Sequence, residues 1–224
     1  MTRPEHGGGG LAACIEHTNL KPTASEAEIV RLCAEAREHG FAAVCVNGGR
    51  IGLVACELAG TTVRPCAVVG FPLGAMASAV KAVEAEHAVA QGACEIDMVL
   101  ALGPFLEGDA AAARSDIEAV VRACGVPVKV ILETGYLGAG GIRRACGVAR
   151  EAGAAFVKTS TGFGPRGASE EDVSIMRAAV GADLQIKASG GIRTQADAQA
   201  LVAAGATRLG TSAGIAIVTG AVGP

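Results

Sequence analysis

Two lysines stand at the ends of short apolar runs, where a folded protein rarely places an ammonium group. They are Lys158 in Ala-Ala-Phe-Val-Lys-Thr-Ser-Thr-Gly-Phe and Lys187 in Leu-Gln-Ile-Lys-Ala-Ser-Gly-Gly-Ile-Arg. A buried ammonium must be paired with an anion, or its pKa must fall. A lysine with a lowered pKa is partly uncharged near neutral pH, so its amine can attack a carbonyl carbon and form a Schiff base. Two such lysines on predicted strands indicate a reactive site.

A carboxylate in another apolar run could serve as the counter-ion of both lysines. Asp97 lies between Ile96 and Met98, so we expect its side chain to point into a mostly apolar interior. An alternative is that Asp97, Lys158 and Lys187 form a buried ion network that only stabilises the interior, because such networks also shift pKa values without catalysis. Residue types alone do not decide which lysine is the nucleophile.

Two further polar residues interrupt apolar runs. Lys129, in Val-Pro-Val-Lys-Val-Ile-Leu, is expected to be an accessory cation that faces the same interior, with Glu133 as its candidate partner. His17 follows Glu16 and could be an acid/base group. We expect it instead to be a core or capping residue.

The elements that must position these groups recur at a steady interval. Short apolar or β-branched runs predict eight strands whose centres lie roughly 23 to 33 residues apart, about the length of one βα unit. These runs are Leu11–His17, Ala42–Val46, Val63–Val69, Glu95–Leu100, Val128–Glu133, Ala155–Ser160, Leu184–Ser189 and Arg208–Thr211. Between them lie helical patterns, three of which have start signals at Ser25, Ser169 and Thr194.

The strands are continuously apolar, which is typical of a parallel sheet that is covered on both faces. Eight regular units predict a closed (β/α)8 TIM barrel in one α/β domain over residues 11–218, with a flexible N-terminal tail at 1–10 and a C-terminal tail at 219–224. An open doubly wound sheet usually carries Gly-x-Gly-x-x-Gly after its first strand, but Thr18-Asn-Leu-Lys-Pro stands there. A helical repeat protein is disfavoured because the units are not self-similar.

Glycine-rich loops follow the strands that end in lysine and the last strand. In a barrel the functional residues lie at the C-terminal ends of the strands, and the loops after strands seven and eight commonly bind phosphate. Gly190 and Gly191 follow the seventh strand, and Gly210-Thr211-Ser212-Ala213-Gly214 ends the eighth. Their N–H groups and the Ser212 hydroxyl could bind a dianion, and Gly162 could add another N–H.

Composition limits the other classes of function. The 224 residues carry 19 basic and 22 acidic side chains, so the net charge is −3, and there is no basic cluster for nucleic acid. The longest uncharged stretches, Pro65–Val80 and Leu209–Pro224, contain Gly or Pro and are shorter than the about 20 residues of a membrane helix.

The sequence contains eight cysteines but no Cys-x-x-Cys pair and no N-terminal signal core, which predicts reduced thiols in the cytoplasm. Cys14, Cys45, Cys66 and Cys94 lie in or beside apolar runs and are expected to be buried.

Several motifs together resemble one family, the 2-deoxyribose-5-phosphate aldolases, over residues 11–218. The motifs are Glu16-His-Thr-Asn-Leu-Lys-Pro, Val44-Cys-Val-Asn, Val69-Gly-Phe-Pro-Leu-Gly, Glu95-Ile-Asp-Met-Val, Phe156-Val-Lys-Thr-Ser-Thr-Gly-Phe and Ile186-Lys-Ala-Ser-Gly-Gly-Ile-Arg-Thr. The resemblance implies a class I aldolase with a barrel fold. It would cleave 2-deoxy-D-ribose 5-phosphate to glyceraldehyde 3-phosphate and acetaldehyde, in deoxyribonucleoside catabolism.

The resemblance also implies roles for individual residues. Lys158 would form the Schiff base, Lys187 would be the cationic neighbour that lowers its pKa, and Asp97 would be the acid/base that acts with Lys187. The substrate-binding residues would be Thr18, Thr161, Gly162, Gly190, Gly191, Gly210 and Ser212. No metal or other cofactor is expected, and the expected assembly is a homo-oligomer, either a dimer or a tetramer.

Two positions depart from the family pattern. Glu16 stands where most members have Asp, and Asn47–Gly49 replaces the more usual Asn-Pro. Two other interpretations also stay open, namely a sugar-phosphate isomerase with a carboxylate base and a barrel that binds a phosphorylated metabolite without catalysis. Sensitivity to borohydride in the presence of acetaldehyde separates the aldolase from both.

Overall fold

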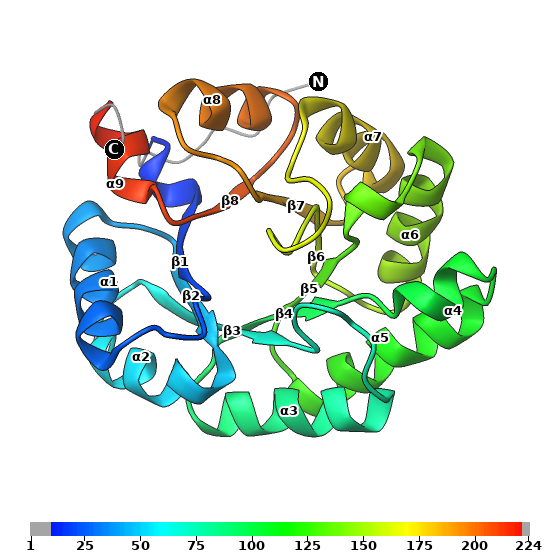
Figure 1. The fold of residues 1–224 in the computed structure, drawn as a ribbon, viewed down its shortest axis with the longest axis horizontal. Coiled ribbons are helices and arrows are strands. Elements are labelled where there is room, and N and C mark those ends of the chain that lie inside the picture. The colour runs from blue at the N-terminus through cyan, green and yellow to red at the C-terminus, as the bar shows by residue number, and fades with distance from the viewer. Residues whose placement is uncertain (1–9, 221–224) are drawn as a thin grey trace.

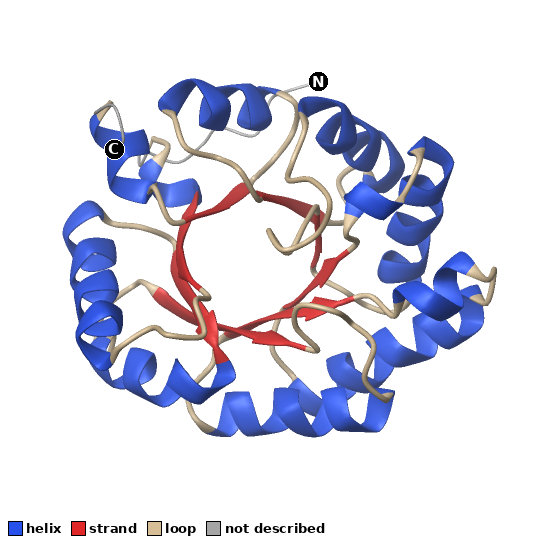
Figure 2. Cartoon of the chain, viewed as in Figure 1, coloured by secondary structure: helices blue, strands red, loops and turns tan. Residues whose placement is uncertain are grey.

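Eight strands pair in chain order and close into a ring, and helices surround that ring (Figures 1 and 2). The structure is a computed structural model that describes residues 10–220. The predicted tails lie mostly in residues 1–9 and 221–224, outside the described range, and stay predictions. The strands are β1 (Ile15–Asn19), β2 (Ala43–Asn47), β3 (Arg64–Val69), β4 (Glu95–Val99), β5 (Val128–Ile131), β6 (Phe156–Lys158), β7 (Gln185–Ser189) and β8 (Arg208–Thr211).

The ring closes because β1 pairs in parallel with both β2 and β8. Glu16 is the Cα partner of Ala43 on one side and of Gly210 on the other. All eight pairings are parallel, which requires a crossover after each strand. The predicted (β/α)8 barrel is therefore confirmed.

Helices and short 3-10 turns make the crossovers, except that η1 precedes β1 and α9 follows β8. The helices are α1 (Glu26–His39), α2 (Ile51–Glu57), α3 (Ser78–Ala90), α4 (Leu102–Leu106), α5 (Ala110–Cys124), α6 (Ala139–Glu151), α7 (Glu170–Val180), α8 (Gln195–Ala203) and α9 (Gly214–Thr219). The 3-10 turns are η1 (Ala12–Cys14), η2 (Gly48–Arg50) and η3 (Thr134–Tyr136). In the described part of the chain, none of the helices is long and apolar enough to cross a bilayer.

The three predicted helix starts are confirmed by their hydrogen bonds. Ser25 accepts from the Glu28 N–H at 3.3 Å, and the Glu28 carboxylate accepts from the Ser25 N–H at 2.8 Å. This capping box satisfies two N–H groups that would otherwise lack partners. Thr194 forms a second box with Asp197, and Ser169 caps α7.

Three predicted strands have an end that is wrong by two residues or more, and one of them is the sixth, which ends at Lys158 rather than at Ser160. The run from Leu11 begins with the 3-10 turn η1, because the Cys14 N–H donates back to the Leu11 carbonyl at 3.0 Å, so β1 starts only at Ile15. The fifth strand ends at Ile131 rather than at Glu133, whose φ of +50° is left-handed and incompatible with a strand. Apolar composition shows where a run is buried but not where its backbone turns.

The strands separate two different interiors. Outward side chains such as Ile96, Met98 and Ile186 pack into one large apolar cluster with the helices. The alternate positions face the barrel axis and include charged residues that are fully buried. Outside the barrel, Lys81 on α3 pairs with Asp116 on α5 at 2.7 Å, and both are buried.

The eight cysteines are free thiols. Cys14, Cys45 and Cys66 are buried, as expected from their apolar surroundings. Cys94 is exposed, so that prediction was wrong. It precedes β4 on the loop from α3, where the chain still runs over the surface.

Candidate active site

A single carboxylate holds three lysines inside the barrel. Asp97 on β4 accepts from Lys129 at Oδ1 (2.9 Å), and from Lys158 and Lys187 at Oδ2 (2.7 Å each). All four side chains are buried, and Lys158 is 2% exposed. The structure thus brings together the three residues that sequence reasoning selected, Asp97, Lys158 and Lys187, and confirms Lys129 as an accessory cation that faces the same interior.

Strand register explains why Lys129 lies deeper in the barrel than Lys158 and Lys187. Asp97 is the Cα partner of Lys129 on β5, whereas Lys158 on β6 is the partner of Ile131, two residues further along β5. Lys187 on β7 lies directly opposite Lys158. Lys129 is therefore deeper, and Lys158 lies nearer the C-terminal mouth, where barrel sites form.

Two more carboxylates complete the charge cluster below the mouth. The Glu16 carboxylate accepts a close hydrogen bond from the Lys187 ammonium group, and its other oxygen lies 3.3 Å from the Arg208 guanidinium group. Glu95 pairs with Lys129 at 2.6 Å. Sequence reasoning did not assign Glu95 or Arg208 to the site, because each stands at the start of its strand rather than at its functional end.

The partner predicted for Lys129 was wrong. Lys129 pairs with Asp97, Glu95 and, at 3.4 Å, with Glu16. The Glu133 carboxylate lies elsewhere and accepts from the Thr161 N–H at 3.2 Å. Because Glu133 follows the end of β5 in a left-handed conformation, its side chain does not continue the inward alternation of that strand.

The mutual pairing sets the charge states of the cluster. Burial alone would raise the pKa of Asp97, but Lys129, Lys158 and Lys187 together hold that pKa well below its usual range. Burial alone would lower the pKa of Lys187, but the negative charges, Asp97 first, raise it above its usual range. The pKa of Lys129 is raised for the same reason. At neutral pH, Asp97 is thus an anion and Lys187 a cation.

A pocket of about 430 Å³ opens above the cluster, and Lys158 lines it. Asp97, Lys187 and Lys129 do not line it. All seven residues predicted to bind substrate line the same pocket: Thr18, Thr161, Gly162, Gly190, Gly191, Gly210 and Ser212. One amine of the cluster is therefore accessible to a ligand, and the predicted ligand-binding loops surround it.

The loop after β7 is held against the loop after β6. Gly190 has φ +90°, and a Cβ there would lie 2.9 Å from the Gly167 Cα. The Ala168 N–H also donates to the Gly190 carbonyl at 3.1 Å. Glycine at position 190 is therefore required for backbone packing between the loops, whatever ligand the pocket binds.

The neighbouring backbone could hold an anion. Within residues 10–220, the N–H groups of Gly191 and Ser212 donate to no protein acceptor. Arg193 and Lys21 also line the pocket and add positive charge. Sequence reasoning missed both cations, although Arg193 follows the Gly190-Gly191 pair by only two residues.

His17 lies at the edge of the pocket as a paired, packed residue. Its Nε2 contacts Glu35 at 2.8 Å, and its ring packs edge-on against Phe41 with centroids 5.2 Å apart. Burial lowers the pKa of His17, although Glu35 opposes this effect. The packing agrees with the expected core role.

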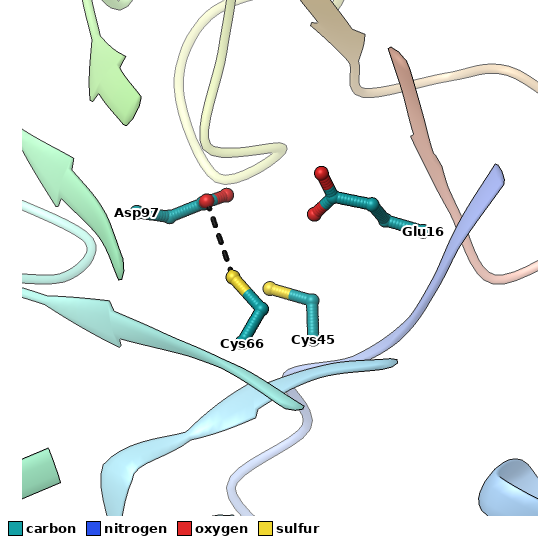
Figure 3. Close-up of side chains that lie close together, drawn as sticks. All are labelled: Glu16, Cys45, Cys66 and Asp97. Carbon is teal, nitrogen blue, oxygen red and sulfur yellow. Dashed lines mark hydrogen bonds between the residues drawn. The ribbon is translucent and has the colours of Figure 1, made fainter. Parts of the chain in front are cut away.

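Thiols and carboxylates also converge in the barrel. Figure 3 shows Glu16, Cys45, Cys66 and Asp97 turned toward one another, and their candidate ligand atoms lie within 4.8 Å of one another. Such atoms can bind a divalent metal. However, the Lys129 ammonium lies 3.4 Å from the Cys66 sulfur and 2.9 Å from Asp97. A metal ion would be placed beside the lysine ammonium groups, so the residues do not fit one.

Comparison with known proteins gives relatives over nearly the whole chain. Deoxyribose-phosphate aldolases of Treponema denticola and Thermoanaerobacter sp. are 48% and 50% identical to it, covering 92% and 93% of this chain and 97% and 95% of theirs. A deoxyribose phosphate aldolase from Aeropyrum pernix, with a structure described as tetrameric, is 33% identical with a TM-score of 0.86. That match covers 93% of this chain and 89% of the other.

The family comparison agrees with these relatives. The model of the DeoC/LacD family aldolases matches residues 15–220, from the start of β1 to the residue after α9. That range contains the charge cluster, the accessible lysine and the pocket above them. The chain therefore belongs to the DeoC/LacD family of aldolases.

Proposed function

We propose that this protein is a class I aldolase that reversibly cleaves 2-deoxy-D-ribose 5-phosphate to glyceraldehyde 3-phosphate and acetaldehyde through a Schiff base on Lys158. The observation that carries the proposal is the position of Lys158. It shares a carboxylate oxygen with Lys187, yet it lines the pocket and Lys187 does not. The names of the relatives support the choice of substrate.

Cations outnumber anions in the charge cluster around Lys158. Five cationic side chains meet three carboxylates there: Lys129, Lys158, Lys187, Arg208 and the half-exposed Arg64 against Glu16, Glu95 and Asp97. Loss of one lysine proton would therefore reduce the imbalance of charge and not create one. Because Lys158 alone among the three lysines borders the pocket, its proton can reach solvent or substrate most directly.

The reaction then follows from amine chemistry. The neutral Lys158 amine adds to C1 of the open-chain sugar, and loss of water gives an iminium ion. The C3 hydroxyl loses its proton as the C2–C3 bond breaks, which releases glyceraldehyde 3-phosphate and leaves an enamine on Lys158. Protonation of the enamine at C2 and hydrolysis of the iminium release acetaldehyde.

Asp97 and Lys187 are the groups placed to move these protons. Both lie within hydrogen-bond distance of one another, and Asp97 also reaches the Lys158 nitrogen at 2.7 Å. Lys187 keeps its proton and its charge, so it can donate, while the anionic Asp97 can accept. No metal or other cofactor is needed for these steps.

The loops after β7 and β8 are proposed to bind the phosphate. Gly191 and Ser212 would donate their N–H groups, and Gly190 would position that backbone. Thr18, Thr161, Gly162 and Gly210 complete the proposed substrate site. We also propose a homo-oligomeric protein of the cytoplasm that acts in deoxyribonucleoside catabolism; the tetrameric relative supports the association of copies.

Reductive trapping tests the nucleophile. Sodium borohydride with acetaldehyde should add an ethyl group to Lys158, and Lys158→Met should abolish the label. Lys81 is an internal control, because it is also a buried, carboxylate-paired lysine but does not line the pocket. Peptide mass spectrometry that placed the label on Lys187 or Lys129 would refute the assignment.

Asp97→Asn should slow turnover by about 10²–10⁴-fold, because proton transfer loses its positioned base. Asp116→Asn is the matched control, since it also removes a buried, lysine-paired carboxylate but lies outside the barrel interior. It should lose stability and keep its kcat. Near-normal turnover in Asp97→Asn would assign Asp97 a structural role only.

The same Asp97 variant should change the pH dependence of stability. The folded pKa of Asp97 is depressed, so ionised Asp97 stabilises the fold above its unfolded pKa, and this contribution is lost as the pH falls toward the folded pKa. Asp97→Asn should cost about 3–5 kcal/mol in the free energy of unfolding at neutral pH. Urea unfolding should show that difference shrinking below about pH 4. A difference independent of pH would contradict this.

Ser212→Asp tests the phosphate site, because the exposed Ser212 side chain can change without disturbing packing. Gly190 is unsuited to this test, since any side chain there collides with Gly167. The new carboxylate should lower kcat/KM for deoxyribose 5-phosphate by about 100-fold, with little effect on unphosphorylated deoxyribose. Ser212→Asn is the uncharged control. Equal losses for both substrates in Ser212→Asp would place the phosphate elsewhere.

A further inference from the structure

Glu133 is a buried carboxylate without a cation. It is 2% exposed, and among the described residues no ion pair includes it. It is also the one non-glycine residue of residues 10–220 with a positive φ, +50°. Both features are unfavourable, since a buried charge loses hydration and a left-handed backbone is strained for residues with a Cβ. The surroundings of Glu133 show what its carboxylate does.

The carboxylate of Glu133 holds both hydrogen-bond donors of Thr161. The Thr161 N–H lies 3.2 Å from Oε2 and 3.3 Å from Oε1, and the Thr161 hydroxyl makes a close contact with Oε2. A carboxylate has no hydrogen to donate, so the hydroxyl hydrogen points at Glu133. Gly164 permits this approach, because a Cβ there would lie 2.7 Å from the Glu133 carboxyl carbon.

The Thr161 hydroxyl is thereby left as an acceptor. One of its two lone pairs accepts from the Phe163 N–H at 3.0 Å. Among the described residues no second donor contacts this oxygen, and Thr161 lines the pocket that contains Lys158. Glu133 does not line that pocket; it lines an adjoining cavity of about 510 Å³, which Thr161 also borders. Glu133 therefore acts on the pocket through Thr161.

We propose that Glu133 is a positioning residue that fixes the Thr161 hydroxyl as an acceptor, so that the pocket selects a ligand hydroxyl at this point over a carbonyl or an anionic oxygen. The inference rests on the proposed function, in which the ligand is a sugar phosphate with hydroxyl groups. It adds a residue to substrate recognition that does not touch the substrate.

Glu133→Gln separates this role from mere packing. A glutamine side chain keeps the size but turns one acceptor into an NH2 donor. With the amide oxygen at the Oε2 position, the NH2 group would face the Thr161 N–H, which lies 3.3 Å from Oε1, so two donors would oppose each other. The other orientation avoids this only by placing the NH2 group against the Thr161 hydroxyl. The hydroxyl would then accept from the amide and direct its hydrogen elsewhere.

The test is a double-mutant cycle with a ligand that cannot react. Wild type, Glu133→Gln, Thr161→Val and the double variant are titrated by calorimetry with 2-deoxyribitol 5-phosphate. Each single variant should weaken binding about tenfold, the effect of one lost hydrogen bond, and the double variant should weaken it no further. Inorganic phosphate, which lacks the sugar hydroxyls, should bind all four proteins equally.

Several outcomes overturn the inference. One is an affinity of Glu133→Gln for 2-deoxyribitol 5-phosphate that equals that of the wild type. Another is a double variant whose loss of affinity is the sum of the two single losses. The third is a loss of affinity for inorganic phosphate as large as that for 2-deoxyribitol 5-phosphate. If Glu133→Gln does not fold, Thr161→Ser and Thr161→Val decide: serine should keep the binding and valine should lose it, and full binding by the valine variant refutes the proposal. Trapping of acetaldehyde on Lys158 is scored separately, so that failure of the aldolase chemistry is distinguishable from failure of this inference.

Discussion

Asp97 carries one negative charge, and three lysine ammonium groups lie within hydrogen-bond distance of its two oxygens. Inside a closed barrel these attractions are much stronger than in water, and so is the cost of leaving any member unpaired. Glu16 and Glu95 supply the remaining negative charge. Arg208 and Arg64 also pair with these two glutamates, so the arrangement has more cations than anions.

The barrel places the members of this charge cluster at different depths, and only Lys158 among its three lysines borders the pocket. Parallel register puts Lys129 level with Asp97 and puts Lys158 two residues nearer the mouth. The Gly190 backbone, packed on Gly167, closes one side of the pocket above Lys158. A buried network that only stabilised the fold would not need an amine at the pocket floor or loops with free N–H groups around it.

Much of this was predictable from the sequence because it depends on local patterns. Apolar runs of regular spacing predicted the eight strands, and a charged residue inside such a run, as at Asp97 or Lys158, must face an interior. The partner of each charged side chain could not be predicted, because ion pairing depends on strand register and on where the backbone turns. Glu133 illustrates this limit: it lies four residues after Lys129, yet its left-handed backbone carries its carboxylate to Thr161.

The central claim is that the charge cluster around Asp97 reacts only through Lys158, the one of its three lysines that lines the pocket. The most direct test is the rate at which acetaldehyde and a borohydride label the protein with and without 2-deoxyribitol 5-phosphate, which can occupy the pocket but cannot react. The account predicts that the label maps to Lys158 and that the saturating ligand slows its appearance. Labelling of Lys158 at an unchanged rate, or a label on Lys187 or Lys129, would contradict it.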